Sequence, residues 1–423
     1  MNCLDNFKKW QSQSILFAWM VCIIAACFYS YDIFIRVAPS VMMSGLEKDF
    51  HIGASSLGFL SAAYFYAYII FQLPAGIIID KFNVRWVIST AMLLCILGNL
   101  LFSVANSFEM AFLGRVLMGI GSAFGFIGAA KVASIWLPNR LFSPFISITV
   151  FIGTMGGLVA DTALSALTHN LGWRLGNNVF TLVGIIILLL MVAFIKNKSN
   201  TSQQAIEKHH SSSLKAQLIM LLGLFRSFKF WVNAIIGAVL FVPINVLASL
   251  WGVGFIQAKM NISSTVAADV NSLLFLGSAI GCIAIAIISA YTNNFRRLII
   301  ISSVLLTVFS IIVIYVALPM WLFVTIYFLL GFSVGAQTLS FGIGKFFAPQ
   351  EATATAVSAV NMINNLVGSI LLPLFGLILA VVANHHVAGQ AYSLHSYYFA
   401  MLMVPLLTLL CIPLCYYIPK EIE

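Results

Sequence analysis

The most regular feature of this sequence is a series of long apolar runs separated by short polar turns. Each run has about 20 residues or more, enough to cross roughly 30 Å of hydrocarbon as a helix. A helix satisfies its own backbone hydrogen bonds in lipid, and the roughly ten-residue alternating segments of a membrane barrel do not occur in this sequence. The pattern predicts twelve spans, at 15–38, 54–79, 84–105, 109–136, 141–165, 174–195, 229–252, 265–290, 298–317, 321–343, 352–383 and 396–418.

The chain also repeats itself at half its length. A charged turn, Gly76 to Trp86, joins the second and third predicted spans, and adding 211 to each position leads to a polar turn, Tyr291 to Arg297, between the eighth and ninth. Asn83 then falls on Asn294 and Arg85 on Arg296. This repeat predicts an all-α membrane protein of two six-helix bundles with pseudo-two-fold symmetry. Its predicted segments are a first bundle at 1–195, a polar linker at 196–226 and a second bundle at 227–423.

Composition and charge agree with a membrane protein. The chain is 61% hydrophobic and 8% charged, whereas soluble domains are about a quarter charged. A net charge of +9 could indicate a nucleic-acid partner, but 15 of the 21 lysines and arginines fall in the segments on one side of the membrane. Because cytoplasmic loops carry the Lys/Arg excess, both termini are predicted to be cytoplasmic and nucleic acid is not an expected partner.

The chemistry of an enzyme is not visible in the sequence. An enzyme needs a nucleophile, a His/Asp pair or a metal cluster, and the seven cysteines and seven histidines form no such set. We therefore expect a protein that is not an enzyme and has no metal and no cofactor. The expected partners are a small-molecule substrate and the lipid bilayer, with the protein as a monomer.

Four charged side chains are expected within the membrane, in the outer half of the predicted spans. Asp32 and Arg36 stand four residues apart, on one helix face. Arg115 and Asp161 each lie about 8 to 10 Å from the outer ends of their spans. An unpaired charge at that depth costs several kcal/mol, so we expect these groups to pair with one another. The alternative for Arg36 is a side chain that reaches the surface with Asp32 as its local partner.

Uncharged polar side chains extend this candidate site. Tyr64, Tyr68 and Gln72 repeat every fourth residue and share one face of the second span. In the second half amides replace charges, and interhelical hydrogen bonding is the alternative to substrate contact for them. The predicted substrate-binding residues are Arg36, Asp32, Tyr64, Tyr68, Gln72, Arg115, Gln337, Asn361, Asn364 and Asn365.

A duplicated six-plus-six arrangement with a cytoplasmic linker resembles the major facilitator superfamily. The turn after the second span resembles the loop signature of that family, with Asn83 in place of its usual glycine and Trp86 in place of its last basic residue. Arg115, followed by Gly119 and Gly121, resembles the family's fourth-helix motif. The resemblance implies the major facilitator fold and transport by alternating access. The residues predicted to act in gating are Gly76, Asp80, Lys81 and Arg85.

Three runs resemble a narrower branch, the phagosomal transporters of intracellular bacteria. They are Tyr31 to Met42, Gln72 to Gly76 and Lys131 to Pro138. This resemblance implies a bacterial inner-membrane protein that imports amino acids, and some members of the branch import nucleosides.

The combined prediction is a secondary active transporter of a small polar metabolite, most consistent with an amino acid, since Asp32 and Arg36 supply both signs of charge. Proton symport is expected, with Asp161 or Asp32 as the proton carrier, because carboxylates are the titratable groups at depth. The alternatives are an organic-anion or nucleoside transporter, or an efflux carrier for metabolites or drugs.

Overall fold

A computed structural model describes residues 2–195, 223–292, 294–347, 353–383 and 392–418, and within them every regular element is helical. The first half contains α1 (Asn2–Val37), α2 (Pro39–Phe50), α3 (Ala54–Lys81), α4 (Val84–Ser103), α5 (Phe108–Ser122), α6 (Gly125–Trp136), α7 (Asn139–Val159), η1 (Ala160–Leu164), α8 (Ser165–Leu171) and α9 (Trp173–Phe194). The second half contains α12 (Phe228–Leu240), η2 (Pro243–Trp251), α13 (Gly252–Met260), α14 (Ser264–Thr292), α15 (Phe295–Tyr315), α16 (Met320–Val334), α17 (Gln337–Gly344), η3 (Lys345–Phe347), α18 (Thr353–Ala383), α19 (Leu394–Met401), α20 (Met403–Leu414) and η5 (Cys415–Tyr417).

These elements confirm the predicted twelve spans, since twelve helical segments of the described chain are long and apolar enough to cross a membrane. The seventh span extends well beyond its predicted end. It does not end at 252 but runs from Phe228 to Met260, because α13 continues the helix beyond η2. Lys259, predicted to lie in an outer loop, is therefore in the last turn of α13, where its Nζ donates to the carbonyl of Ile314 at 2.7 Å. Its apolar stem packs along the helix end while the ammonium reaches a carbonyl.

The sequence repeat has a structural counterpart at the start of α4 and of α15. The side chain of Asn83 accepts a hydrogen bond from the backbone N–H of Arg85, and that of Asn294 accepts one from Arg297, both at 3.0 Å. Each asparagine thus caps the N-terminus of the third span of its half. The linker predicted at 196–226 lies largely outside the described residues, so the exact boundaries of the bundles stay a prediction.

The arginines of the repeat also act alike. Arg85 donates through Nη2 to the carbonyl of Val192, near the end of α9. Arg296 donates through Nε to the carbonyl of Ile418, just after η5, at 2.8 Å. In each half a cation therefore binds carbonyls at the C-terminal end of the last span, where unsatisfied carbonyls and the negative end of the helix dipole favour it.

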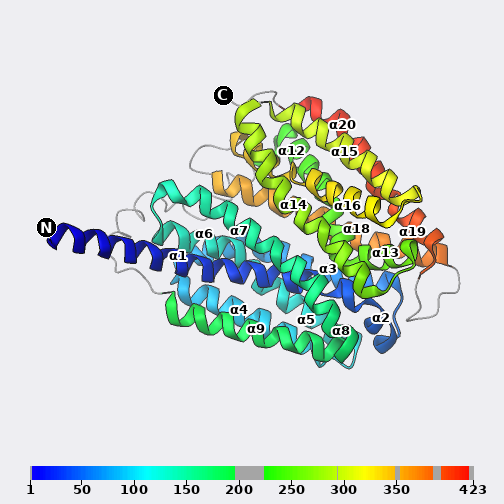
Figure 1. The fold of residues 1–423 in the computed structure, drawn as a ribbon, viewed down its shortest axis with the longest axis horizontal. Helices are drawn as coiled ribbons and strands as arrows, with labels where there is room; N and C mark the ends of the chain where they lie inside the picture. The colour runs from blue at the N-terminus through cyan, green and yellow to red at the C-terminus, as the bar shows by residue number, and fades with distance from the viewer. Residues whose placement is uncertain (1, 196–222, 293, 348–352, 384–391, 419–423) are drawn as a thin grey trace.

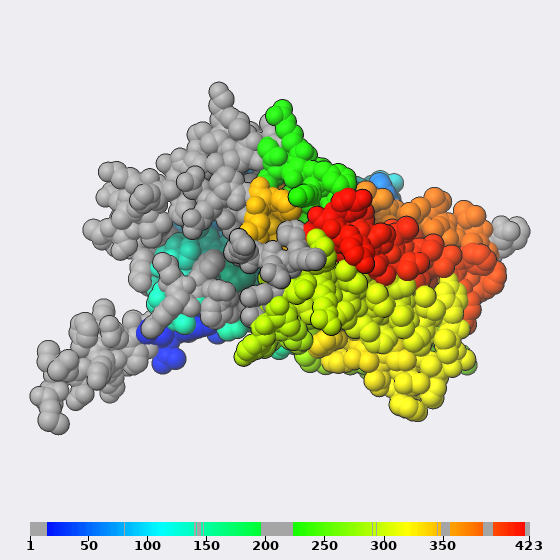
Figure 2. Space-filling view, turned by 90° about the horizontal axis from the view of Figure 1, so that it is seen from above, coloured from blue at the N-terminus to red at the C-terminus, as the bar shows by residue number. Residues whose placement is uncertain are grey.

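The two halves lie side by side, and α1 begins at the same end of the molecule as α20 ends (Figure 1). Viewed from above, most of the coloured atoms on this face belong to the second half, from green to red (Figure 2). The most extensive contact between halves is that of α3 with α18. A Cβ added to Gly58 would lie 2.7 Å from the carbonyl oxygen of Leu372, and one on Gly376 would lie 2.3 Å from that of Ala54. Glycine therefore allows these two backbones to approach closely at the predicted outer end.

Candidate functional site

The candidate site is built around the last turn of α1. Asp32 is fully buried and Arg36 is 7% exposed. Arg36 Nη2 lies 3.5 Å from Asp32 Oδ1, which confirms the predicted pairing of these two residues. The hydroxyl of Tyr64, on α3, donates to the same carboxylate oxygen. The carboxylate thus holds the guanidinium and the phenol together, and both are kept out of water.

Arg36 also reaches the second half. Its Nη1 donates to Asn365 Oδ1, on α18, at 3.4 Å. Asn365 Nδ2 donates in turn to the backbone carbonyl of Asn361 at 2.9 Å, and Asn361 Nδ2 donates to the hydroxyl of Tyr68 at 3.5 Å. With Asp32 and Tyr64, six of the predicted substrate-binding residues are therefore brought together where α1, α3 and α18 meet.

Aromatic rings surround the guanidinium of Arg36. Its Cζ lies 5.4 Å from the ring centroids of Tyr64 and Phe65 and 5.2 Å from that of Tyr68. Tyr64 and Tyr68 are stacked, as their spacing of four residues predicts. These faces attract the cation while leaving its N–H groups available, and Arg36 Nε has no hydrogen-bond partner among the residues that the structure describes.

Arg115 does not pair with a carboxylate, so the expectation of mutual pairing is wrong for this residue. Its Nη1 donates to the carbonyl of Ile35 at 2.6 Å, and its Nη2 donates to those of Arg36 and Ser61 at 3.3 Å. The reason is Pro39, which has no N–H to give to the carbonyl four residues before it, that of Ile35. Arg115 fills this vacancy and so fixes the end of α1 from within its own half.

Asp161 also departs from the predicted pairing, since none of the described ion pairs joins it to Arg36 or Arg115. It is fully buried in η1, a short π-helical segment that continues α7. Ser40 Oγ donates to its Oδ1 at 3.0 Å, and Asn271 Nδ2 donates to its Oδ2 at 2.7 Å. Neutral donors from α2 and α14 therefore take the place of the expected arginine.

Three predicted binding residues lie apart from Arg36. Both polar atoms of the buried Asn364 side chain have no partner, and a Cβ on Gly237 of α12 would lie 3.2 Å from its Oδ1, so this amide faces the interior of the second half. Gln337 begins α17, and Gln72 is buried further along α3 with its Oε1 unpartnered. Their role in binding stays a prediction.

The gating residues lie at the opposite end of α3. Lys81 is exposed and Arg85 caps α9, whereas the side chain of Asp80 lies outside the described part of the structure. A Cβ added to Gly76 would meet nothing within 4 Å. An apolar cavity of about 440 Å³, lined by Ile78 and its neighbours on α3 and α4, lies at this end and away from Arg36. The gating role of these residues remains a prediction.

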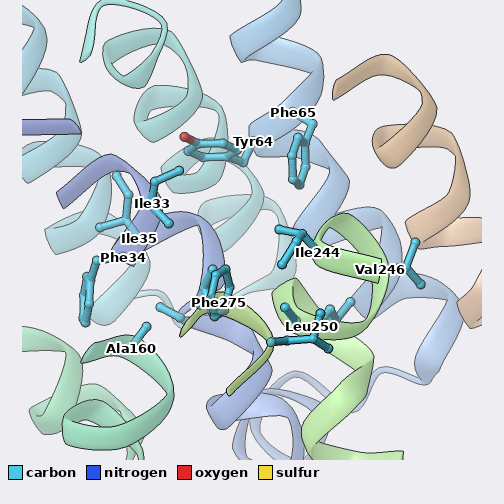
Figure 3. Close-up of a cluster of buried hydrophobic side chains, with 14 of the residues drawn as sticks. Ile33, Phe34, Ile35, Tyr64, Phe65, Ala160, Ile244, Val246, Leu250 and Phe275 are labelled. Atoms are coloured by element: carbon cyan, nitrogen blue, oxygen red, sulfur yellow. The ribbon is translucent and has the colours of Figure 1, made fainter. Parts of the chain in front are cut away.

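Apolar side chains from both halves surround the polar site. Figure 3 shows Ile244 of η2 and Phe275 of α14 lying beside Ile33 of α1 and Phe65 of α3. A Cβ on Gly157 would lie 2.7 Å from the ring of Phe275, so α7 and α14 also pack closely. Because water is excluded there, each hydrogen bond around Arg36 and Asp161 is stronger than the same bond in solvent.

Three residues of the site were not predicted from the sequence, namely Ser40, Asn271 and Tyr327. Asn271 Oδ1 accepts a hydrogen bond from the hydroxyl of Tyr327 at 2.8 Å, which extends the contacts of Asp161 to α16. Asn271 lies in an apolar run, and the same reasoning that selected Asn361 would have selected it. Ser40 and Tyr327 have no comparable sequence signal, because hydroxyl groups are common near span ends.

Comparison with protein families identifies the chain. The family model of the Major Facilitator Superfamily matches residues 22–373. The chain belongs to the major facilitator superfamily. The major facilitator fold predicted from the duplication is thereby confirmed.

Curated relatives in this superfamily match shorter segments. The chain is 26% identical over 176 residues to the uncharacterized transporter YybO of Bacillus subtilis (strain 168), covering 42% of this chain and 40% of that protein. It is 26% identical over 170 residues to the probable galactarate/D-glucarate transporter GudP of the same organism, covering 38% and 36%. The probable L-galactonate transporter of Escherichia coli (strain K12) is 24% identical over 259 residues, covering 58% and 56%. Each match spans less than two thirds of the relative.

Solved structures match the whole fold. A bacterial homologue of the human lysosomal transporter Spinster, inward-facing and occupied, superposes with a TM-score of 0.77 at 16% identity, covering 94% of this chain and 96% of that one. A D-xylose-proton symporter gives 0.74 at 14% identity, covering 96% and 98%. At such identities the likeness concerns the fold alone.

Proposed function

We propose that this transporter moves a hydroxylated organic acid of the sugar-acid class, with Arg36 binding the carboxylate. The observation that carries the proposal is the reach of Arg36 from α1 to Asn365 on α18. A ligand held by Arg36 therefore lies where both halves can contact it, as alternating access requires. A guanidinium binds a carboxylate through two parallel hydrogen bonds, and the Nε of Arg36 has no partner in the structure.

The neighbours of Arg36 suit hydroxyl groups. Asn361 and Asn365 offer amide donors and acceptors, and Tyr68 offers a phenol. They are uncharged, so they can bind the hydroxyls of a sugar acid without requiring a second charge on the ligand. The curated relatives include probable galactarate/D-glucarate transporters and a probable L-galactonate transporter, which supports the same class.

The geometry favours this class over the amino acid expected from the sequence. An ammonium group needs a carboxylate that faces the ligand. Asp32 Oδ1 is already held by Arg36 and Tyr64, and its Oδ2 lies 3.4 Å from the position of a Cβ on Gly125, the first residue of α6. We therefore favour a sugar acid as the substrate over the amino acids and nucleosides implied by the phagosomal branch. We also favour sugar-acid transport over efflux.

The remaining parts of the proposal concern the coupling ion, the membrane in which the protein lies and its orientation there. We propose proton symport, carried by Asp161 or Asp32, in a bacterial inner membrane with both termini cytoplasmic and the protein as a monomer. The even number of spans, which brings the start of α1 and the end of α20 to one end of the molecule, supports termini on the same side.

Binding to the purified protein tests the substrate class. Titration calorimetry with D-glucarate and D-glucuronate should give heats of binding, and the diamide of D-glucarate, which keeps the hydroxyls and loses the charges, should bind at least about tenfold more weakly. A mixture of the common amino acids should not displace D-glucarate. Displacement by amino acids, or equal binding of acid and amide, would show that Arg36 does not select a sugar-acid carboxylate.

A further inference from the structure

The carboxyl group of Asp161 lies on the contact between the two halves. Its hydrogen bonds to Ser40 and Asn271 join η1, α2 and α14, and Asn271 continues to Tyr327 on α16. The second hydrogen bond of Asn271 Nδ2 is donated to the carbonyl of Ala248 in η2, at 3.2 Å. A single carboxyl group therefore holds together elements of the first and the second half.

The groups that face Asp161 do not balance a negative charge. Ser40, Asn271 and Tyr327 are neutral, and the charged side chain that acts on it from α14 is the exposed carboxylate of Asp269. Arg36, on α1, is engaged by Asp32 and Asn365. Elsewhere on α2, the buried Glu47 accepts a hydrogen bond from the hydroxyl of Tyr392 at 3.0 Å. An ionised Asp161 would thus be a buried charge without a described cation partner, which is costly, whereas a protonated one is neutral.

Both helices that meet at Asn271 are wound as π-helices. η1 carries Asp161 in the first half, and η2 carries Ala248 in the second. Single π-helical turns are uncommon and are frequently found at functional sites. Here they bring a carboxyl group of the first half and a backbone carbonyl of the second half to the same amide nitrogen, Nδ2 of Asn271.

We infer that Asp161 is the coupling-proton site of this transporter, with Ser40 and Asn271 as its ligands, and that releasing the proton opens the contact between the halves at the predicted outer end. The inference rests on the proposed proton symport and selects Asp161 over Asp32. Protonated Asp161 keeps the halves together, as in this structure. Ionised Asp161 requires water, which it gains when α2 and η1 separate from α14.

Distance measurements on the substrate-free protein test this inference. Spin labels attached at the exposed positions Asn170 and Ser264, with the seven native cysteines replaced by alanine, report the separation of α8 and α14. At acidic pH the labels should show the short distance of this structure, and at alkaline pH a second, longer distance should dominate. Asp161→Asn, which is neutral at every pH, should keep the short distance throughout.

Two controls assign the response to Asp161. Glu47→Gln and Asp269→Asn remove the other carboxylates near this contact and should leave the pH response in place. Ser40→Ala keeps the titrating group but weakens the closed contact, so its opening should shift towards acid by about half to one pH unit. A pH response that survives Asp161→Asn, or that is lost in Glu47→Gln, would overturn the inference.

The same sample also tests whether the coupling ion is a proton or sodium. If sodium chloride, but not potassium chloride, restores the short distance at alkaline pH, the site binds sodium and the proton assignment is wrong. Because these measurements use no substrate, they are independent of the sugar-acid proposal. That proposal fails separately, if purified protein does not bind D-glucarate.

Discussion

Two buried arginines, Arg36 and Arg115, act differently although their side chains lie on neighbouring helices. Arg36 bonds to side chains, Asp32 and Asn365, on both sides of the contact between halves. Arg115 bonds to backbone carbonyls within its own half. The first arrangement can release its partners to a ligand without unfolding a helix end, whereas the second cannot. We therefore assign ligand binding to Arg36 and structural support to Arg115.

Substitution of Arg36 separates charge from geometry. Arg36→Lys keeps the cation but loses the planar pair of donors, so D-glucarate binding should weaken by about 1–3 kcal/mol. Arg36→Ala should weaken it further. Calorimetric titration of the folded variants gives the free energies. Unchanged affinity in Arg36→Ala would mean that Arg36 merely pairs with Asp32.

Substitution of Arg115 should affect stability instead. A lysine has a single donor nitrogen, which cannot occupy the positions of both Nη1 and Nη2 and so leaves a buried carbonyl unsatisfied. Arg115→Lys should therefore lower the free energy of unfolding by about 1–3 kcal/mol. A thermal melt in detergent measures the loss. The folded fraction should bind D-glucarate within about twofold of the wild type. A variant of normal stability that has lost binding would place Arg115 in the ligand site.

Sequence reasoning found the buried charges and the pairing of Asp32 with Arg36, but not the partners of Arg115 and Asp161. Asp32, Arg36, Arg115 and Asp161 could be selected because ionisable groups in apolar runs are costly and therefore few. Their partners depend on details that composition does not carry, such as the carbonyl left free by Pro39 or the register that brings Asn271 to Asp161. Asp161 and the two arginines lie at similar predicted depths, but this did not suffice to predict ion pairs between them. The neutral donors Ser40 and Asn271 bind the carboxyl group of Asp161 instead.

At the level of elements, the contact between the halves depends on α3 and α18. Gly58 and Gly376 permit their backbones to meet, and Tyr392 adds a polar contact by accepting a hydrogen bond from the N–H of Ala54 at 2.8 Å. Burial beside Glu47 raises the pKa of Tyr392, so its phenol keeps its proton at physiological pH. These contacts all lie near the start of α3.

A methyl group at this contact should hinder its closure. In Gly376→Ala the new Cβ would lie 2.3 Å from a backbone oxygen, a distance that forces α18 away from α3. The spin-label distance at the outer end should lengthen at every pH, and transport should slow. Gly53→Ala is the matched control, since a Cβ there meets nothing within 4 Å. Identical behaviour of the two variants would show that close packing of α3 and α18 is not needed.

The arrangement of elements was more predictable than the site. The offset of 211 residues relates Asn83 to Asn294, and the side chain of each caps the N-terminus of the helix that follows. The two turns therefore have equivalent roles, as the repeat predicts. The length of the seventh span and the π-helical turns of η1 and η2 were not predictable. Apolar residues have the same pattern whether a helix continues or ends, and π-helical winding results from packing between helices.

At the scale of the whole molecule, the chain has the major facilitator fold, and its halves share one buried layer of polar groups. Arg36 and Asn365 form the proposed substrate contact within it, and Asp161 and Asn271 form the proposed proton contact. Both contacts join the halves, so the occupancy of each would alter how the halves meet. Coupling then needs no direct contact between substrate and proton.

Transport by the purified protein in liposomes tests this account most directly. With an acidic exterior, labelled D-glucarate should accumulate above its external concentration, and a protonophore should abolish the accumulation. Arg36→Ala should not take up D-glucarate, whereas Asp161→Asn should exchange it without concentrating it. If the wild type fails to transport D-glucarate while exchanging labelled amino acids, the account of Arg36 as a sugar-acid contact is contradicted.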